Sequence, residues 1–128
     1  MESREALSRL ADLQRSLEAR MVSLDGSPAA VLALGPAVLD FAASEEYAFL
    51  PLLELLDPAV RAELAGEHDS LAQDLELLGW LVETTPESTD AAVLAEALTR
   101  RIRQHIARDG RLLAQAHRLD AAGRDPRR

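Results

Sequence analysis

Apolar residues recur along this chain every three or four positions, in four stretches separated by short polar segments. The first stretch runs from about Ser3 to Leu24, and its apolar seam has a single vacancy, at Gln14. A period near 3.6 residues with one apolar face predicts a helix that buries that face. The segment 25–28 (DGSP) has the composition of a turn and is expected to end this helix.

The second stretch predicts a helix whose start is marked by proline. It begins near Pro28 or, as the pattern favours, at Pro36, because Gly35 interrupts what precedes it and proline suits a first helical turn. Pro51 is expected to kink or end this helix, which leaves residues 52–56 as a short tail.

Two further helices complete the pattern. The third opens at Asp57-Pro58, an N-cap residue followed by proline, and runs to about Val82. A polar loop at 84–90 separates it from the fourth, which extends from about Asp90 to Leu119. Four amphipathic helices with short connections predict an all-α, antiparallel up-down-up-down four-helix bundle over residues 1–119. Residues 120–128 are expected to form a flexible C-terminal tail.

Composition agrees with this fold class and also bears on the cellular location and the binding partners of the protein. Aromatic residues make up only 3% of the chain, which disfavours a sheet, and the lack of cysteine excludes disulfides and thiolate metal sites. The net charge of −8 argues against a nucleic-acid binder. The longest uncharged stretch, Gly26 to Leu39, has 14 residues, too few to span a bilayer, and the charged N-terminus shows no signal peptide. We therefore expect a cytoplasmic protein that binds neither nucleic acid nor membrane.

Four polar residues fall where the helical pattern calls for apolar core. They are Glu45 in the second helix, His68 in the third, and His105 and Asp109 one turn apart in the fourth. His68 lies 18 residues before Pro86 and His105 lies 19 residues after it, and a similar count relates Glu45 to His68 across the preceding turn. At about 1.5 Å per residue, the four side chains share one level of the bundle. Buried carboxylates and imidazoles must be paired or must bind a metal, so this level predicts a polar cluster.

Three segments at this level carry a resemblance to a known family. They are 41–51 (FAASEEYAFLP), 67–71 (EHDSL) and 105–109 (HIARD). In this order and spacing they resemble the hemerythrin-like, or HHE cation-binding, domains of bacteria. Those domains are four-helix bundles that hold a non-haem di-iron centre. The similarity extends over about residues 3–118.

The resemblance implies a metal-binding role for the polar cluster. Glu45 matches the bridging carboxylate, His68 the third-helix histidine, and His105 and Asp109 the fourth-helix pair.

This chain also departs from the family pattern. The histidine expected in the first helix is replaced by Gln14, and the one expected in the second by Phe41, with Asp40 one residue away if the register shifts. A shift by one residue would also turn Leu13 inward in place of Gln14. Two imidazoles and two carboxylates remain, with Gln14, Asp40 and Glu46 as further candidate ligands. This set suffices for one divalent ion such as iron or zinc, and falls short of the ligands that two irons need.

Three interpretations therefore remain open. The first is a hemerythrin-like binding or sensing module, not an enzyme, that holds at most one weakly bound metal ion. The second is a metal-independent interaction protein, a homodimer or a binder of another protein, in which Glu45 pairs with His68 and His105 pairs with Asp109. The third is a working non-haem iron site that binds oxygen.

Two residues outside the cluster also carry expectations. Glu67 flanks His68 on an outward face and is expected to be solvated. Trp80, the only tryptophan, lies off the apolar seam and is expected either to pack beneath a loop or to mark an interface.

Overall fold

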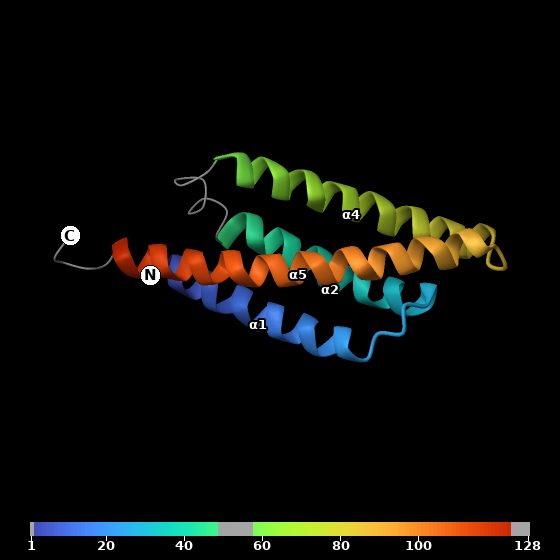
Figure 1. The fold of residues 1–128 in the computed structure, drawn as a ribbon, viewed down its shortest axis with the longest axis horizontal. Coiled ribbons are helices and arrows are strands. Elements are labelled where there is room, and N and C mark those ends of the chain that lie inside the picture. The colour runs from blue at the N-terminus through green and yellow to red at the C-terminus, as the bar shows by residue number, and fades with distance from the viewer. Residues whose placement is uncertain (1, 49–57, 124–128) are drawn as a thin grey trace.

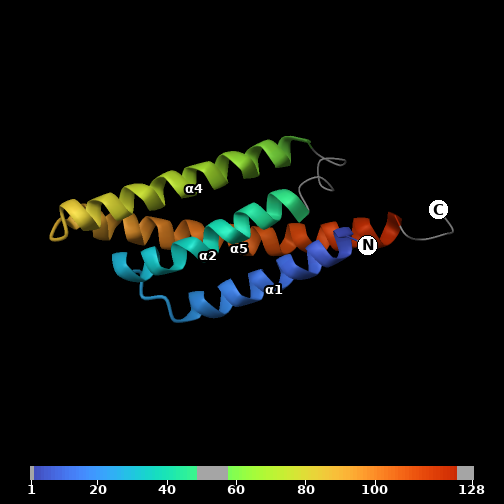
Figure 2. The same ribbon diagram turned by 180° about the vertical axis from the view of Figure 1, so that it is seen from behind.

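The chain folds as a bundle of long helices. The computed structural model describes residues 2–48 and 58–123, and this part of the chain contains four helices and no strand. The helices are α1 (Glu2–Val22), α2 (Pro28–Ala48), α4 (Pro58–Thr84) and α5 (Thr89–Gly123). Successive helices run in opposite directions along the long axis (Figure 1), and the view from behind shows the same order (Figure 2). The predicted all-α four-helix bundle is confirmed.

The helices do not all contact one another equally. α1 and α4 each pack against α2 and α5, and α2 and α5 also contact each other across the bundle, whereas α1 and α4 do not meet within the described residues. Small buried residues on α2, among them Gly35 and Ala42, allow close approach of its backbone. A Cβ atom added at Gly35 would already lie 3.6 Å from Leu75 of α4. α2 and α5 are therefore the central pair of the bundle.

The apolar seams predicted from the helical period form the observed core. On α1, Leu10 and Leu17 are buried on either side of Gln14, which is itself only 7% exposed. Leu13 is only partly buried, so Gln14 and not Leu13 occupies the inward position. The other helices contribute a continuous apolar cluster, in which the largest buried side chains include Phe41, Leu34, Leu64, Leu71, Leu78, Leu98 and Ile102. Burial of each such side chain contributes roughly 1.5–3 kcal/mol.

The start of α2 differs from the interpretation that the pattern favoured. The helix begins at Pro28, where the Ser27 hydroxyl accepts a hydrogen bond from the backbone N–H of Ala30 at 3.3 Å. Ser27 is thus the N-cap, and the chain enters it through Gly26 in the left-handed region, with φ +77°. Pro36 lies inside the helix, on its exposed face, where water can satisfy the carbonyl group that proline leaves without a donor.

The end of α5 also differs from the expected boundary. α5 continues to Gly123, four residues beyond the expected end at Leu119, so the predicted tail is partly helical. The predictions for Pro51, residues 52–56 and Asp57 concern positions outside the described residues, as does the rest of the tail at 124–128.

α2 runs without interruption from Pro28 to Ala48, so its apolar segment is longer than the sequence predicts. It has 21 residues and contains an 18-residue window with a mean hydropathy of 1.2, so it is long and apolar enough to cross a membrane by length and composition. The expected break at Gly35-Pro36 is therefore absent. In this bundle the inward face of α2 lies in the core, and that face carries Glu45 with no exposed surface.

Pro36 offers a test of how the second helix is built. Replacing Pro36 with Ala restores a backbone N–H donor to the helix, which stabilises the folded state. The replacement also makes the unfolded chain more flexible, which offsets part of this gain. We therefore expect the free energy of unfolding to rise by about 1–2 kcal/mol. Pro28→Ala, in the first turn where no helical hydrogen bond is missing, serves as the control and should not stabilise. Urea denaturation measures both. A loss of stability in Pro36→Ala would show that the proline ring itself supports the packing of α2.

Candidate metal centre

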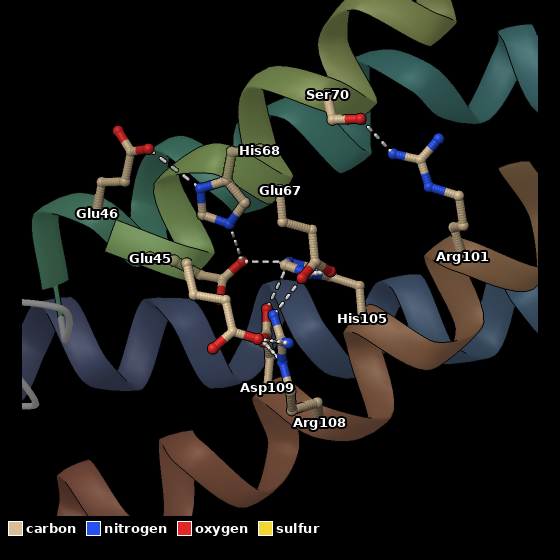
Figure 3. A network of polar contacts seen from close by, with 10 residues as sticks. Glu45, Glu46, Glu67, His68, Ser70, Arg101, His105, Arg108 and Asp109 are labelled. Carbon is tan, nitrogen blue, oxygen red and sulfur yellow. Dashed lines mark hydrogen bonds and ion pairs between the residues drawn. The ribbon is translucent and has the colours of Figure 1, made fainter. Parts of the chain in front are cut away.

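The four inward polar residues meet at one point in the core. Glu45 comes from α2, His68 from α4, and His105 and Asp109 from α5, so three helices contribute. Each residue offers one ligand atom, and these atoms all lie within 4.8 Å of one another. None of the four is more than 5% exposed. The cluster predicted from depth along the helices is confirmed as a spatial cluster (Figure 3).

One carboxylate oxygen of Glu45 lies at the middle of this cluster. Oε1 of Glu45 is 3.2 Å from Nε2 of His68 and 3.0 Å from Nε2 of His105. Nε2 of His105 is also 2.6 Å from Oδ2 of Asp109. The two imidazole rings stand edge to face, with centroids 5.1 Å apart. Both histidines therefore turn the same ring nitrogen, Nε2, toward the same interior point.

The opposite nitrogens of the two rings face outer carboxylates. Nδ1 of His68 lies 3.1 Å from Oε1 of Glu46, and Nδ1 of His105 makes a short contact with Oε1 of Glu67. When Nδ1–H donates to a carboxylate, a neutral imidazole presents its Nε2 lone pair on the other side. Each histidine is thus oriented as a metal-ligating histidine usually is, with Nε2 directed into the cluster.

The two outer carboxylates differ in how firmly they are held. Glu67 is only 26% exposed and also contacts Arg108 on α5, which in turn binds Glu63 at 3.2 Å. Glu46 is 50% exposed and has no second partner among the described residues. Figure 3 shows Glu67 and Arg108 side by side over His105, whereas Glu46 approaches His68 from the opposite edge. His105 therefore has the more rigid support.

Glu67 was expected to be solvated, and this expectation was wrong. It lies at the edge of the face that α4 turns to α5, and Arg108 and His105 both reach it there. The sequence feature that corresponds to this contact is a pair of glutamates four residues apart on α4, Glu63 and Glu67, which both pair with Arg108 on α5. The pairing can be recognised only when it is known which face of α5 lies opposite α4.

The remaining candidate ligands are placed less favourably. Asp40 is exposed and lies outside the cluster, and Glu46 acts as a partner of His68 and not as a member of the inner group. Gln14 is buried, and its Nε2 donates to the carbonyl of Ile106 at 3.3 Å and to Glu18 at 3.0 Å. The approach of Gln14 to α5 depends on Gly110, where an added Cβ atom would lie 2.5 Å from Nε2 of Gln14.

Phe41 occupies the position where the family resemblance expects a further histidine. Its ring is 1% exposed and stands edge-on to His105, with centroids 6.4 Å apart. The aromatic ring closes this side of the cluster with hydrocarbon.

Burial and charge act against each other on the ionisable groups. Burial alone would lower the pKa of His105, but the neighbouring Asp109 and Glu45 outweigh it and raise the pKa to about 10. Burial would likewise lower the pKa of His68, and Glu45 and Glu46 raise it above its ordinary value. Burial alone would raise the pKa of Glu45, yet the two imidazoles lower it to about 2. Burial raises the pKa of Asp109 to about 7, against the opposing effect of His105.

Several oxygen atoms of the cluster have no hydrogen-bond donor. Oε2 of Glu45 and both carboxylate oxygens of Asp109 are buried without a hydrogen bond, and so is Oε1 of Gln14. The 2.6 Å approach of Asp109 to His105 does not have the direction of a hydrogen bond. Buried acceptors without donors are costly. Two nitrogen and two oxygen donors at this spacing can hold a divalent metal ion, which would satisfy the carboxylates.

Comparisons with known proteins add no assignment. No protein-family model, curated protein or solved structure matches this chain.

The shifted pKa values predict how the stability of the metal-free protein depends on pH. The pKa of His105 is raised from 6.5 to about 10 on folding, so its contribution is complete below pH 6.5 and is lost as pH rises toward 10. The pKa of Glu45 is lowered from 4.5 to about 2, so its contribution is lost as pH falls through that range. Carboxylates from all three packed helices face His105, namely Glu45, Glu67 and Asp109. The pKa of Asp109 is raised from 3.8 to about 7, so its contribution is also lost as pH rises through that range. We therefore expect denaturation midpoints, measured with a chelator present, to fall on both sides of a maximum at about pH 4.

His117 provides the control for this measurement, because it is exposed on the same helix. His105→Gln should flatten the alkaline limb, whereas His117→Gln should leave it in place. An unchanged midpoint between pH 7 and pH 10 in the unsubstituted protein would contradict the raised pKa of His105.

Proposed function

We propose that this chain is a metal-binding module that holds one divalent ion, iron or zinc, at Glu45, His68, His105 and Asp109. The observation that carries the proposal is the convergence of four ligand atoms around buried carboxylate oxygens that have no donor. Two carboxylates and two neutral imidazoles around a divalent ion sum to zero charge, which removes the cost of burying the carboxylates.

The ligand set favours one ion over two. Two imidazoles and two carboxylates complete a single coordination shell, and Phe41 fills with hydrocarbon the side from which a further histidine would approach. These features support a hemerythrin-like bundle with an incomplete di-iron site, and they give no support to a second iron. A bound ion of this kind supplies a positive centre to which an oxygen or nitrogen donor can be added.

Deep burial favours binding or sensing over turnover. The four ligands are 0–5% exposed, and Glu67 with Arg108 covers the side of His105 that is nearest to solvent. A substrate would have to displace this ion pair to reach the centre. The protein's own residues would therefore hold and orient an ion.

The metal-independent interpretation has one observation in its favour. Oε1 of Glu45 lies within hydrogen-bond distance of both imidazoles, so part of the cluster satisfies itself without an ion. If this were the whole role of the cluster, replacing both histidines with leucine would leave thermal stability unchanged or improved. The three carboxylate oxygens without donors argue for the metal.

Elemental analysis tests the proposed function. Protein from cells supplied with iron and zinc should contain about one ion per chain, and the ion should be lost in His68→Ala and in His105→Ala. His117→Ala, which removes the third histidine of the chain from an exposed position, should retain it. Saturation with the bound metal should raise thermal stability, by about 2.7 kcal/mol at a hundredfold excess over Kd. Two ions per chain would contradict the single-ion site. Failure of iron, zinc and manganese to bind or stabilise the protein would contradict metal binding.

The outer carboxylates predict a graded loss of affinity. Glu67→Ala should weaken metal binding about 10–100-fold, because His105 loses the partner that orients it. Glu67→Gln keeps an acceptor for Nδ1–H and should recover part of the loss. Glu63→Gln, one turn away and 69% exposed, is the control and should change affinity little. Competition with a chelator of known affinity measures all three. Equal affinities in Glu67→Ala and the unsubstituted protein would show that Glu67 does not position His105.

A further inference from the structure

An apolar cleft lies between α4 and α5, away from the metal centre. Its volume is about 420 Å³, and it is lined by Leu77, Leu81, Asp90, Val93, Leu94 and Ala97. The lining comes from the hairpin end of the two helices, which reaches farther along the long axis than the connection between α1 and α2 (Figures 1 and 2). α2 reaches the level of the cleft on the inner side of the hairpin, where Leu32 lies next to Gly79, and the cleft is open on the side where Leu77 and Val93 are exposed.

Large apolar side chains are exposed around the cleft. Leu77 is 45% exposed and Val93 is 65% exposed. Trp80 is 58% exposed and lies three residues after Leu77, so it shares the face of α4 that borders the cleft. At this exposure Trp80 does not pack beneath a loop, which was one of the two expectations for this residue. The other, that it marks an interface, stays a prediction. Exposed apolar side chains gathered at a cleft, with a tryptophan beside it, are typical of a protein interface.

Charge around the cleft has a single sign. From Ser70 to Thr99 the sequence contains six acidic residues and no basic one. Asp74 is paired with Arg101, whereas the other five carry exposed or partly exposed carboxylates without an ion pair among the described residues: Glu76, Glu83, Glu87, Asp90 and Glu96. Asp90 lies in the lining itself, and the two helix segments that form the cleft carry only negative unpaired charge; we refer to these five carboxylates as the acidic rim.

We propose that the cleft formed by α4 and α5 at the hairpin end binds a basic amphipathic helix of a partner protein. A groove between two helices accepts the apolar face of a third, through residues spaced at i, i+3, i+4 and i+7. Arginine or lysine residues at the edges of that helix would face the acidic rim, and one of them can stack on Trp80. This proposal does not depend on metal binding.

The negative charge around the cleft also disfavours two other occupants, a second copy of this chain and an anionic membrane. A symmetric dimer through this cleft would bring Asp90 and the acidic segments of both copies together, and two molecules of net charge −8 already repel one another. An anionic membrane surface would be repelled by the same rim. A basic helix is the occupant that both the apolar lining and the rim attract.

Peptide binding can be followed by the fluorescence of Trp80, because it is the only tryptophan of the chain. The probe is a synthetic peptide of about 18 residues, free of tryptophan and tyrosine, with leucine on one helical face and arginine on the other. Its matched controls are a peptide with glutamate in place of arginine and one with the same residues in scrambled order. We expect the leucine–arginine peptide alone to give a saturable blue shift of Trp80 emission, which weakens as salt is added.

Two substitutions locate the binding. Val93→Glu places a charge in the cleft at an exposed position and should weaken peptide binding by about tenfold or more. Val22→Glu makes the same change at a site on α1 that is 87% exposed and outside the cleft, and should leave binding unchanged. Circular dichroism checks that both variants remain folded.

Three outcomes would overturn the proposal. Equal binding of the peptide to Val93→Glu and to the unsubstituted protein would show that the cleft is not its site. Equal binding of the glutamate peptide would remove the role of the acidic rim. Concentration-dependent dimerisation in light scattering that Val93→Glu abolishes would make a second copy of this chain the occupant.

Discussion

Two carboxylates buried at one level of a helical core are the constraint on which the rest of this structure depends. Glu45 and Asp109 have no exposed surface, and an ionised carboxylate without a partner there would cost several kcal/mol. Compensation comes from His68 and His105, which belong to different helices. A slip of any one of α2, α4 and α5 by a turn, about 5.4 Å, would separate the imidazoles from the carboxylates. The polar cluster therefore specifies the register of the bundle, which leucine contacts alone leave less well defined.

The close packing of α2 against α5 is what makes this cluster possible. Gly35 of α2 leaves room for Leu75 of α4, and Glu45 on the same helix reaches His105 of α5 at 3.0 Å. Gly110 has a similar role on the other side of α5, because it leaves room for Gln14. Glycine within a helix costs about 1 kcal/mol relative to alanine. At Gly110 a residue that is unfavourable to the helix itself makes room for a buried polar side chain.

Periodicity predicted the inward positions, and depth along the helices predicted that Glu45, His68, His105 and Asp109 meet, because both depend only on helix geometry. Contacts between the flanks of neighbouring helices were not predictable in this way. Glu67 lies one position from the inward seam, and its role depends on the rotation of α4 relative to α5. Pro36 was misread because proline fits both a first turn and an exposed position farther along. The cap at Ser27 decides between them, and its hydrogen bond appears only in three dimensions.

The four candidate ligands come from α2, α4 and α5, whereas α1 packs against α2 and α5 and places the buried Gln14 against Ile106 of α5. α1 therefore acts as a cover over a ligand set that the other three helices assemble. Helices and helix pairs of a bundle can open separately, at a free energy below that of complete unfolding. Detachment of α1 would bring solvent to the centre while leaving the ligands in place. The lifetime of a bound ion would then be governed by this partial opening and not by global unfolding.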